Sequence, residues 1–287
     1  MRQPTSTTLA ASVNPSAFGQ PVLFTASVSP VTATGTVTFK DGARVAGTGA
    51  VVSGKAHFTT ATLSPGTHSI TAAYDGNNIF LASTSRALSQ VVNKASTKAT
   101  VVSSHNPSVF GQSVTFTASV IAVAPGKGMP VGTVTFKNGG AVLSTQTLSG
   151  GKAAFSTSAL TPGTHSITVM YNGSGDFGAS TSAVQTQTVN KASSLTRLTS
   201  TSNPSRLGQT VTFTLTVSTV APGTGVPTGS VALKNGSATI QTATLVNGRA
   251  TISTSALGHG THDMKAVYSG STNELARTST VLTQTVN

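Results

Sequence analysis

The stretch Ser113–Val120 has the sequence SVTFTASV, in which apolar and small polar side chains alternate. Its apolar members are Val114, Phe116, Ala118 and Val120. Successive side chains of a β-strand point to opposite faces of the sheet, so this period of two predicts a strand with one buried side and one side facing solvent.

Further strands and turns are predicted on both sides of this stretch. The predicted strands cover residues 97–103, 113–120, 132–137, 141–148, 152–160, 165–171 and 180–189. Asn138-Gly139-Gly140 predicts a hairpin turn and Pro162-Gly163 another turn, because Asn and Gly tolerate positive φ and Pro restricts the chain. Seven short strands separated by turns, with no helical period, predict an immunoglobulin-like β-sandwich.

Three copies of this pattern follow one another. The repeated anchors are Asn-Pro-Ser from Asn14, Asn106 and Asn203, Gly-Thr-His from Gly66, Gly163 and Gly260, and tyrosine at Tyr74, Tyr171 and Tyr268. The first copy is five residues shorter before its next strand, where the other two carry Val-Ala-Pro-Gly, and we expect a shortened loop there. The predicted domains are residues 1–93, 94–190 and 191–287, each of them one sandwich of an all-β chain.

The predicted linkers are short. Lys94-Ala95-Ser96 and Lys191-Ala192-Ser193 follow the last strand of a copy directly, and neither contains a Gly/Ser-rich or Pro-rich spacer. A last strand that passes almost directly into the next first strand restricts bending between domains. We therefore expect an extended array, with about 35 to 40 Å per domain at about 3.3 Å per strand residue.

At this level of detail the chain resembles a known family. Residues 106–118, 132–136 and 162–171 are similar to the bacterial Ig-like domain repeats of large secreted and surface proteins. The resemblance covers all three copies. It implies an immunoglobulin-like fold and a role as a stalk, spacer or adhesive module, and it implies no ligand.

The third copy departs from the pattern at two places. Leu207 precedes a glycine where the other copies have Phe18 and Phe110. Glu274-Leu275 replaces the Asp176-Phe177 of the second copy. We expect these changes to alter local packing and to leave the fold intact.

No motif in the chain predicts catalysis. Cysteine is absent and only five residues are acidic, so paired carboxylates, thiolate metal sites and calcium loops lack their ligands. His68, His165 and His262 are equivalent residues of separate copies, and one histidine per copy predicts a strand residue and not a metal ligand. We expect no catalytic, cofactor-binding or metal-binding residues, and no cofactor.

The charge pattern bears on partners and location. The net charge is +12, but it arises from missing acids and no run of basic residues occurs, so specific nucleic-acid binding is not expected. No stretch of 18 apolar residues occurs, which predicts no membrane span. The first residues lack the apolar segment of a signal peptide, so the chain is either cytosolic or cut from a longer secreted protein. We expect an extracellular or cell-surface location.

These observations lead to a non-catalytic structural stalk or spacer of a larger extracellular or cell-surface protein. Its expected partners are other domains of the same longer chain, with a cell-surface polymer or carbohydrate as a further candidate. One alternative is an adhesive or carbohydrate-binding module that acts through loops at the ends of the sandwich, for which Phe80 and Phe177 are the loop aromatics. Another alternative is an immunoglobulin-like decoration of a virion surface.

Overall fold

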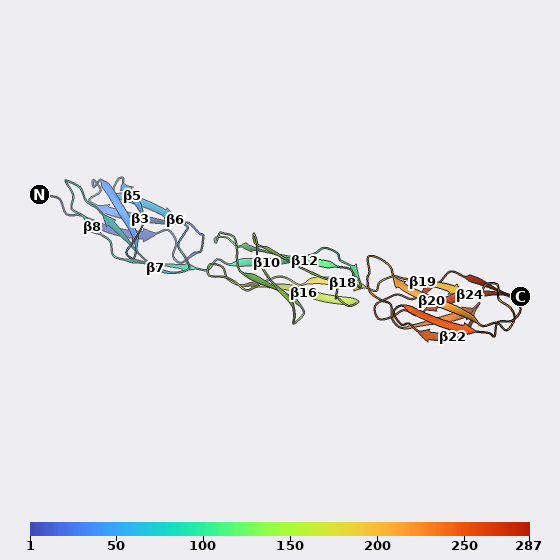
Figure 1. The fold of residues 1–287 in the computed structure, drawn as a ribbon. Helices are drawn as coiled ribbons and strands as arrows, with labels where there is room; N and C mark the ends of the chain where they lie inside the picture. The colour runs from blue at the N-terminus through green and yellow to red at the C-terminus, as the bar shows by residue number, and fades with distance from the viewer. The chain divides into compact units, whose positions relative to one another are not determined.

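The computed structural model describes all residues from 1 to 287, and every regular element in it is a β-strand. Figure 1 shows each copy, called a repeat from here on, as a small set of sheets in its own part of the colour scale. Each repeat has seven strands of five or more residues, and one or two strands of two residues are added to them. The predicted all-β fold of three immunoglobulin-like repeats is therefore confirmed.

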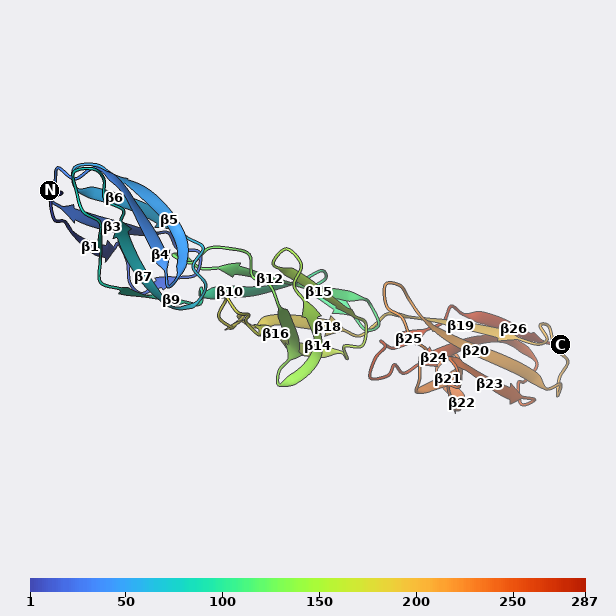
Figure 2. The ribbon, with the colours of Figure 1, turned by 60° about the vertical axis from the view of Figure 1, so that its left-hand side comes forward.

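The first repeat consists of two sheets, both of which can be followed in Figure 2. One sheet has the order β1 (Ser6–Ala11), β3 (Val22–Ser29) and β6 (Lys55–Thr60). The other has the order β2 (Ser16–Ala17), β9 (Leu88–Asn93), β7 (Gly66–Tyr74), β4 (Gly35–Asp41) and β5 (Arg44–Val51), and β8 (Ser83–Thr84) pairs with β7. The short β2 runs parallel to β9, while the other pairs are antiparallel.

The second repeat uses the same order of strands. Its three-stranded sheet consists of β10 (Thr97–Ser103), β12 (Val114–Ala122) and β15 (Lys152–Thr157). Its larger sheet consists of β11 (Ser108–Val109), β18 (Gln185–Asn190), β16 (Gly163–Tyr171), β13 (Thr133–Asn138) and β14 (Ala141–Thr147), with β17 (Ser180–Thr181) paired to β16.

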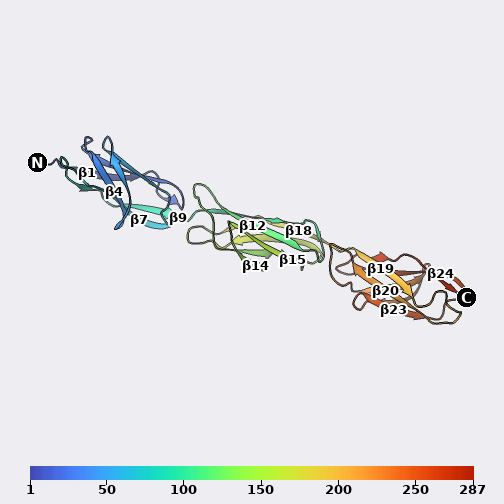
Figure 3. The same ribbon diagram turned by 45° about the horizontal axis from the view of Figure 1, so that its top comes forward.

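The third repeat differs only in its shortest strands. Its smaller sheet consists of β19 (Ser194–Ser200), β20 (Val211–Thr219) and β23 (Arg249–Thr254). Its larger sheet contains β22 (Ala238–Thr244), β21 (Ser230–Asn235), β24 (Gly260–Tyr268), β25 (Arg277–Thr278) and β26 (Leu282–Val286). Figure 3 labels β19, β20 and β23 of one sheet and β24 of the other.

The buried residues are those that the alternation predicts. In β12 the side chains of Val114, Phe116, Ala118 and Val120 are at most 2% exposed, while their neighbours are half-buried or exposed. The same alternation buries one face of β3 in the first repeat and of β20 in the third. The core of each repeat is thus formed by inward-facing residues of its strands, as expected for a sandwich.

One tyrosine per repeat anchors a loop to the core. Tyr74, Tyr171 and Tyr268 end β7, β16 and β24 and are at most 1% exposed. Each hydroxyl donates a hydrogen bond to a backbone carbonyl 40 residues earlier, at 2.6 to 2.8 Å. Burial raises the pKa of Tyr74 and of Tyr268. The three hydroxyls fix the loop that precedes β4, β13 or β21.

The shortened loop of the first repeat lies where the sequence places it. β3 and β4 are joined by residues 30–34, whereas β12 and β13 are joined by residues 123–132 and β20 and β21 by residues 220–229. The five missing residues therefore come from a connection between the two sheets and leave the strands complete.

The predicted strand 180–189 is two strands, β17 and β18. The hydroxyl of Ser182 accepts a hydrogen bond from the backbone N–H of Val169 at 3.0 Å and donates one to Ala183 O at 2.9 Å. A side chain that takes over backbone hydrogen bonds in this way interrupts the ladder. The prediction of one continuous strand was wrong for this reason.

Contacts divide the chain into two compact units. The first comprises Met1–Val101, Ala118–Ala153 and Thr168–Ala183, and the second comprises Val102–Thr117, Ala154–Ile167 and Val184–Asn287. Each junction between repeats therefore lies inside a unit: the one after Asn93 in the first, and the one after Asn190 in the second.

Candidate functional site

The few acidic and histidine side chains do not gather at one place. No group of three or more His, Cys, Asp or Glu side chains lies close enough together to hold a metal ion. The chain also contains no helix long and apolar enough to cross a membrane. The polar features that remain are one cleft in the first repeat, a buried glutamine in each repeat, and the junctions between repeats.

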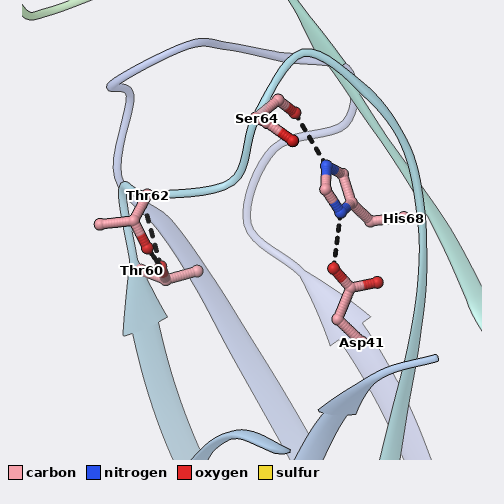
Figure 4. A network of polar contacts seen from close by, with 5 residues as sticks. All are labelled: Asp41, Thr60, Thr62, Ser64 and His68. Carbon is pink, nitrogen blue, oxygen red and sulfur yellow. Dashed lines mark hydrogen bonds and ion pairs between the residues drawn. The ribbon is translucent and has the colours of Figure 1, made fainter. Parts of the chain in front are cut away.

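The cleft contains His68 of β7, held at both ring nitrogens (Figure 4). Its Nδ1 lies 2.6 Å from Asp41 Oδ2 and its Nε2 lies 2.8 Å from Ser64 O. Burial of the ring lowers the pKa of His68, but the bonds to Ser64 and Asp41 and the charge of Asp41 outweigh it, so the pKa is raised. Both ring nitrogens can donate to these oxygens only when the ring is protonated, so the contacts favour the charged form.

This charged pair belongs to the first repeat alone. The matching residue of Asp41 is Asn138 in the second repeat and Asn235 in the third, where Nδ2 lies 2.9 Å from His262 Nδ1. The cleft has a volume of about 350 Å³ and is also lined by Arg44. The three equivalent histidines are strand residues, as expected: His68 lies in β7, His165 in β16 and His262 in β24. The Nε2 atom of each contacts the backbone carbonyl of the residue four positions earlier.

A buried glutamine lies three residues before the terminal Asn of each repeat, and no sequence motif predicted it. Gln90, Gln187 and Gln284 are fully buried, and each Nε2 donates to a serine hydroxyl and to a backbone carbonyl. The oxygen atoms differ between repeats. Gln187 Oε1 accepts a hydrogen bond from Ser103 Oγ at 2.5 Å, whereas Oε1 of Gln90 and of Gln284 has no partner. The recurrence of Gln three residues before the terminal Asn is the sequence signal that could have predicted this buried hydrogen-bonding side chain.

The first linker, residues 94–96, is held against the second repeat. Only residues 94–96 separate β9 from β10, and Ala95 forms a parallel bridge with Phe177. Lys94 Nζ donates to Ser174 O at 2.6 Å. Phe177 is 3% exposed and its ring packs against Phe18 of the first repeat, so it offers no aromatic surface to a ligand.

The second linker repeats these contacts. Ala192 forms a parallel bridge with Glu274, and Lys191 Nζ donates to Ser271 O at 2.5 Å. The Glu274 side chain is 2% exposed and accepts a hydrogen bond from the hydroxyl of Ser271. The bridge places Glu274 at the position of Phe177 and Asn273 at that of Asp176, so the expectation that Glu274 replaces Asp176 was wrong by one residue. Glu274 is buried and hydrogen-bonded within its loop.

In the first junction the end of one repeat contacts the long loop of the next. The rings of Phe18 and Phe177 lie edge to face with centroids 5.5 Å apart. Lys127 donates its backbone N–H to Phe18 O at 3.1 Å. Gly19 has φ +76°, and a Cβ on this residue would overlap the carbonyl of Lys127. Glycine is needed both for the turn and for the approach of the loop.

The second junction has the same plan. Thr224 Oγ1 donates to Gly111 O at 2.8 Å, and its backbone N–H lies 3.4 Å from Phe110 O. Gly111 has φ +77°, and a Cβ there would overlap the carbonyl of Thr224. We call this pair of elements, the Phe-Gly turn of one repeat and the long loop of the next, the joint.

A fold of repeated sandwiches joined in this way defines a tandem immunoglobulin-like array. The family profile of the bacterial Ig-like domain (group 3) matches residues 8–93, 101–190 and 198–287, and the chain belongs to this family. Domains of this family are generally non-catalytic and are typically extracellular or at the surface.

Several solved structures are similar to the chain. The three N-terminal domains of the bacteriophage RB49 highly immunogenic outer capsid protein share 13% identity over 99% of both chains, with a TM-score of 0.30. Fibronectin(III)-like modules of Clostridium thermocellum CbhA share 16% identity over 64% of this chain and 94% of theirs, with a TM-score of 0.27. The ICAM-5 D1–D4 fragment shares 14% identity over 99% of this chain and 77% of its own, with a TM-score of 0.38. The comparison with curated proteins finds no match.

Proposed function

We propose that the chain is a non-catalytic structural spacer of a larger extracellular or cell-surface protein. The observation that supports this role is the recurrence of the linker and joint contacts in both junctions, while residues that could carry chemistry do not recur as a set. A spacer has to keep consecutive domains in a fixed relation, and an enzyme has to keep a catalytic group.

The linkers supply part of this support. One residue, Lys94 or Lys191, lies between the last strand residue of a repeat and the bridged alanine that follows it. A chain with so few free dihedral angles transmits orientation from one repeat to the next, in contrast to a flexible Gly/Ser linker.

The partners in this proposal are other domains of the same longer chain. The net charge of +12 adds a weak, salt-dependent attraction to anionic polymers at a cell surface. This attraction requires no binding pocket.

Distance measurements between repeats test the spacer role. The chain has no cysteine, so pairs of introduced cysteines can carry spin labels. Lys55, Lys152 and Arg249 are equivalent exposed residues of the three repeats. We expect the pairs Lys55→Cys with Lys152→Cys, and Lys152→Cys with Arg249→Cys, to give narrow distance distributions.

The control for this experiment is a Gly-Ser segment inserted after Asn93. It should broaden the distribution of the first pair and leave that of the second unchanged. Distributions in the parent chain that are as broad as those with the inserted segment would contradict the spacer role.

The cleft of the first repeat favours a second candidate, a carbohydrate-binding module. Asp41 and Arg44 line it, the ring of Phe58 contributes an apolar wall, and the residues that match the two charges in the other repeats are neutral. Charged groups beside an aromatic ring are a usual combination in ligand pockets. Binding of the full chain to a glycan array, and loss of that binding in Arg44→Ala, would support this candidate. If the full chain binds no glycan on the array, the candidate is excluded.

A further inference from the structure

The third repeat has an exposed turn that matches the Phe-Gly turns of the two joints. Its turn contains Leu207 and Gly208, at the positions of Phe18-Gly19 and Phe110-Gly111. Both Phe-Gly pairs are half-buried, whereas the Leu207 side chain is 64% exposed. A Cβ on Gly208 would meet no atom within 4 Å.

The shape of this turn is the same in all three repeats. Gly19, Gly111 and Gly208 have φ values of +76°, +77° and +77°. The residue before each glycine donates its backbone N–H to the carbonyl of the terminal Asn of its repeat, at 2.8 to 2.9 Å. The turn of the third repeat is therefore formed in the conformation that receives a loop in the other two.

We propose that the Leu207–Gly208 turn is a docking surface for a further immunoglobulin-like repeat that carries the long loop Ala-Pro-Gly-x-Gly. The turn is equivalent in sequence position, φ and hydrogen bonding to the turns of the two joints, and this equivalence identifies the partner. Leu207 supplies an apolar side chain where Phe18 and Phe110 contact the loop of the following repeat. The inference rests on the joints and holds whether or not the array acts as a spacer.

The loop is recognised mainly through its backbone, which explains the sequence that the partner needs. Lys127 and Thr224 occupy the same place in the two loops, and in both the backbone N–H points to the preceding turn. The first glycine of each loop, Gly126 or Gly223, lies against the linker alanine, and a Cβ on it would lie 2.7 Å from that alanine Cβ. The glycines are therefore required, whereas the x residue is Lys127 in one loop and Thr224 in the other, where the Thr224 hydroxyl adds a bond to Gly111 O.

A second copy of this chain does not provide such a partner. The long loops of the second and third repeats are already in contact with Phe18 and Phe110. The first repeat has residues 30–34 in place of the long loop and so lacks the element that contacts a preceding turn. A repeat of the second or third type with an unoccupied loop is what the surface fits.

The test uses a chain of four repeats, in which residues 94–190 are appended after Asn287. Spin labels at Arg249→Cys and at the equivalent of Lys152 in the appended repeat report on the new joint. We expect a distance distribution as narrow as that across the second natural joint. Shortening the appended loop by five residues, to the length found in the first repeat, should abolish the narrow distribution.

A glycine pair separates docking from misfolding of the turn. Gly111→Ala should broaden the distribution across the second natural joint, because its Cβ overlaps Thr224 O. Gly208→Ala has the same φ and should leave the three-repeat chain unchanged in this measurement, but should broaden the distribution across the new joint. A new joint that is broad in the parent four-repeat chain, or that responds neither to Gly208→Ala nor to the shortened loop, would overturn the proposal.

Discussion

The unpaired oxygen of Gln90 predicts that Ala11→Ser stabilises the first repeat. Ala11 ends β1 and matches Ser103 of β10, whose hydroxyl donates to Gln187 Oε1 at 2.5 Å. In the first repeat that hydroxyl is missing, and the buried Oε1 of Gln90 has no partner. A serine at residue 11 supplies the donor when its side chain takes the orientation of Ser103, and not that of the equivalent Ser200, which leaves Gln284 Oε1 without a partner.

The magnitude follows from the hydrogen bond and its cost. Leaving a buried acceptor unsatisfied costs about 1–3 kcal/mol, and a typical intramolecular hydrogen bond contributes about 1 kcal/mol net. Because the new hydroxyl must itself leave water, we expect a gain of about 1 kcal/mol. For a domain of this size that gain corresponds to a rise in Tm of about 4–8 °C.

The assay uses the single tyrosine of each repeat. Fluorotyrosine at Tyr74, Tyr171 and Tyr268 gives one fluorine signal for each repeat, so thermal unfolding is followed separately in the three. Ala11→Ser should raise the midpoint of the Tyr74 signal alone.

Two serines serve as controls. Ser103→Ala should lower the midpoint of the second repeat, since it removes the existing bond. Ser200→Ala should have little effect, because Gln284 Oε1 accepts no hydrogen bond. An unchanged or lowered Tyr74 midpoint in Ala11→Ser would refute the reasoning.

Three further predictions concern single repeats. Because the folded-state pKa of His68 is raised, its stabilisation of the first repeat is fully present below about pH 6.5 and is lost as the pH rises through the folded pKa. We expect the lost stability to be at most about 1 kcal/mol, since the pair is partly exposed. Asp41→Asn should lower the pKa of His68 in an NMR titration and reduce this loss of stability. An unchanged titration would contradict the role of Asp41. Phe116→Ala removes a fully buried ring and should destabilise the second repeat by about 3–5 kcal/mol in denaturant titrations, and a loss below about 1 kcal/mol would count against the assigned strand face. Tyr171→Phe should cost about 1–2 kcal/mol by the same measurement, because Val131 O loses its donor, and an unaltered midpoint would show that the bond contributes nothing.

The sequence predicted the strands and the repeat well because both are written as periodic patterns. Alternation identified the buried face of β12, and the comparison of copies placed the missing loop residues after β3. It did not predict β11, the two-residue strand that runs parallel to β18, because two residues carry no period.

The polar contacts were harder to predict for a different reason. Alternation predicts which face of the sheet a side chain occupies, but it does not predict which distant residue that side chain contacts. The contact partners of Gln187 and Phe18 were therefore not predicted. The domain boundaries after residues 93 and 190 and the extended arrangement of the array stay predictions, and small-angle scattering tests the latter.

The bridged alanines of the linkers have a consequence for proteolysis. Proteases cut most readily in exposed, locally unfolded segments, and the connection between domains is where such segments are commonly found. A trypsin-like enzyme meets a lysine in each linker, but Asn93 on one side belongs to β9 and Ala95 on the other is bridged to Phe177. Cleavage after Lys94 or Lys191 therefore requires strand pairing to open first, which gives these connections the resistance of the domains that they join.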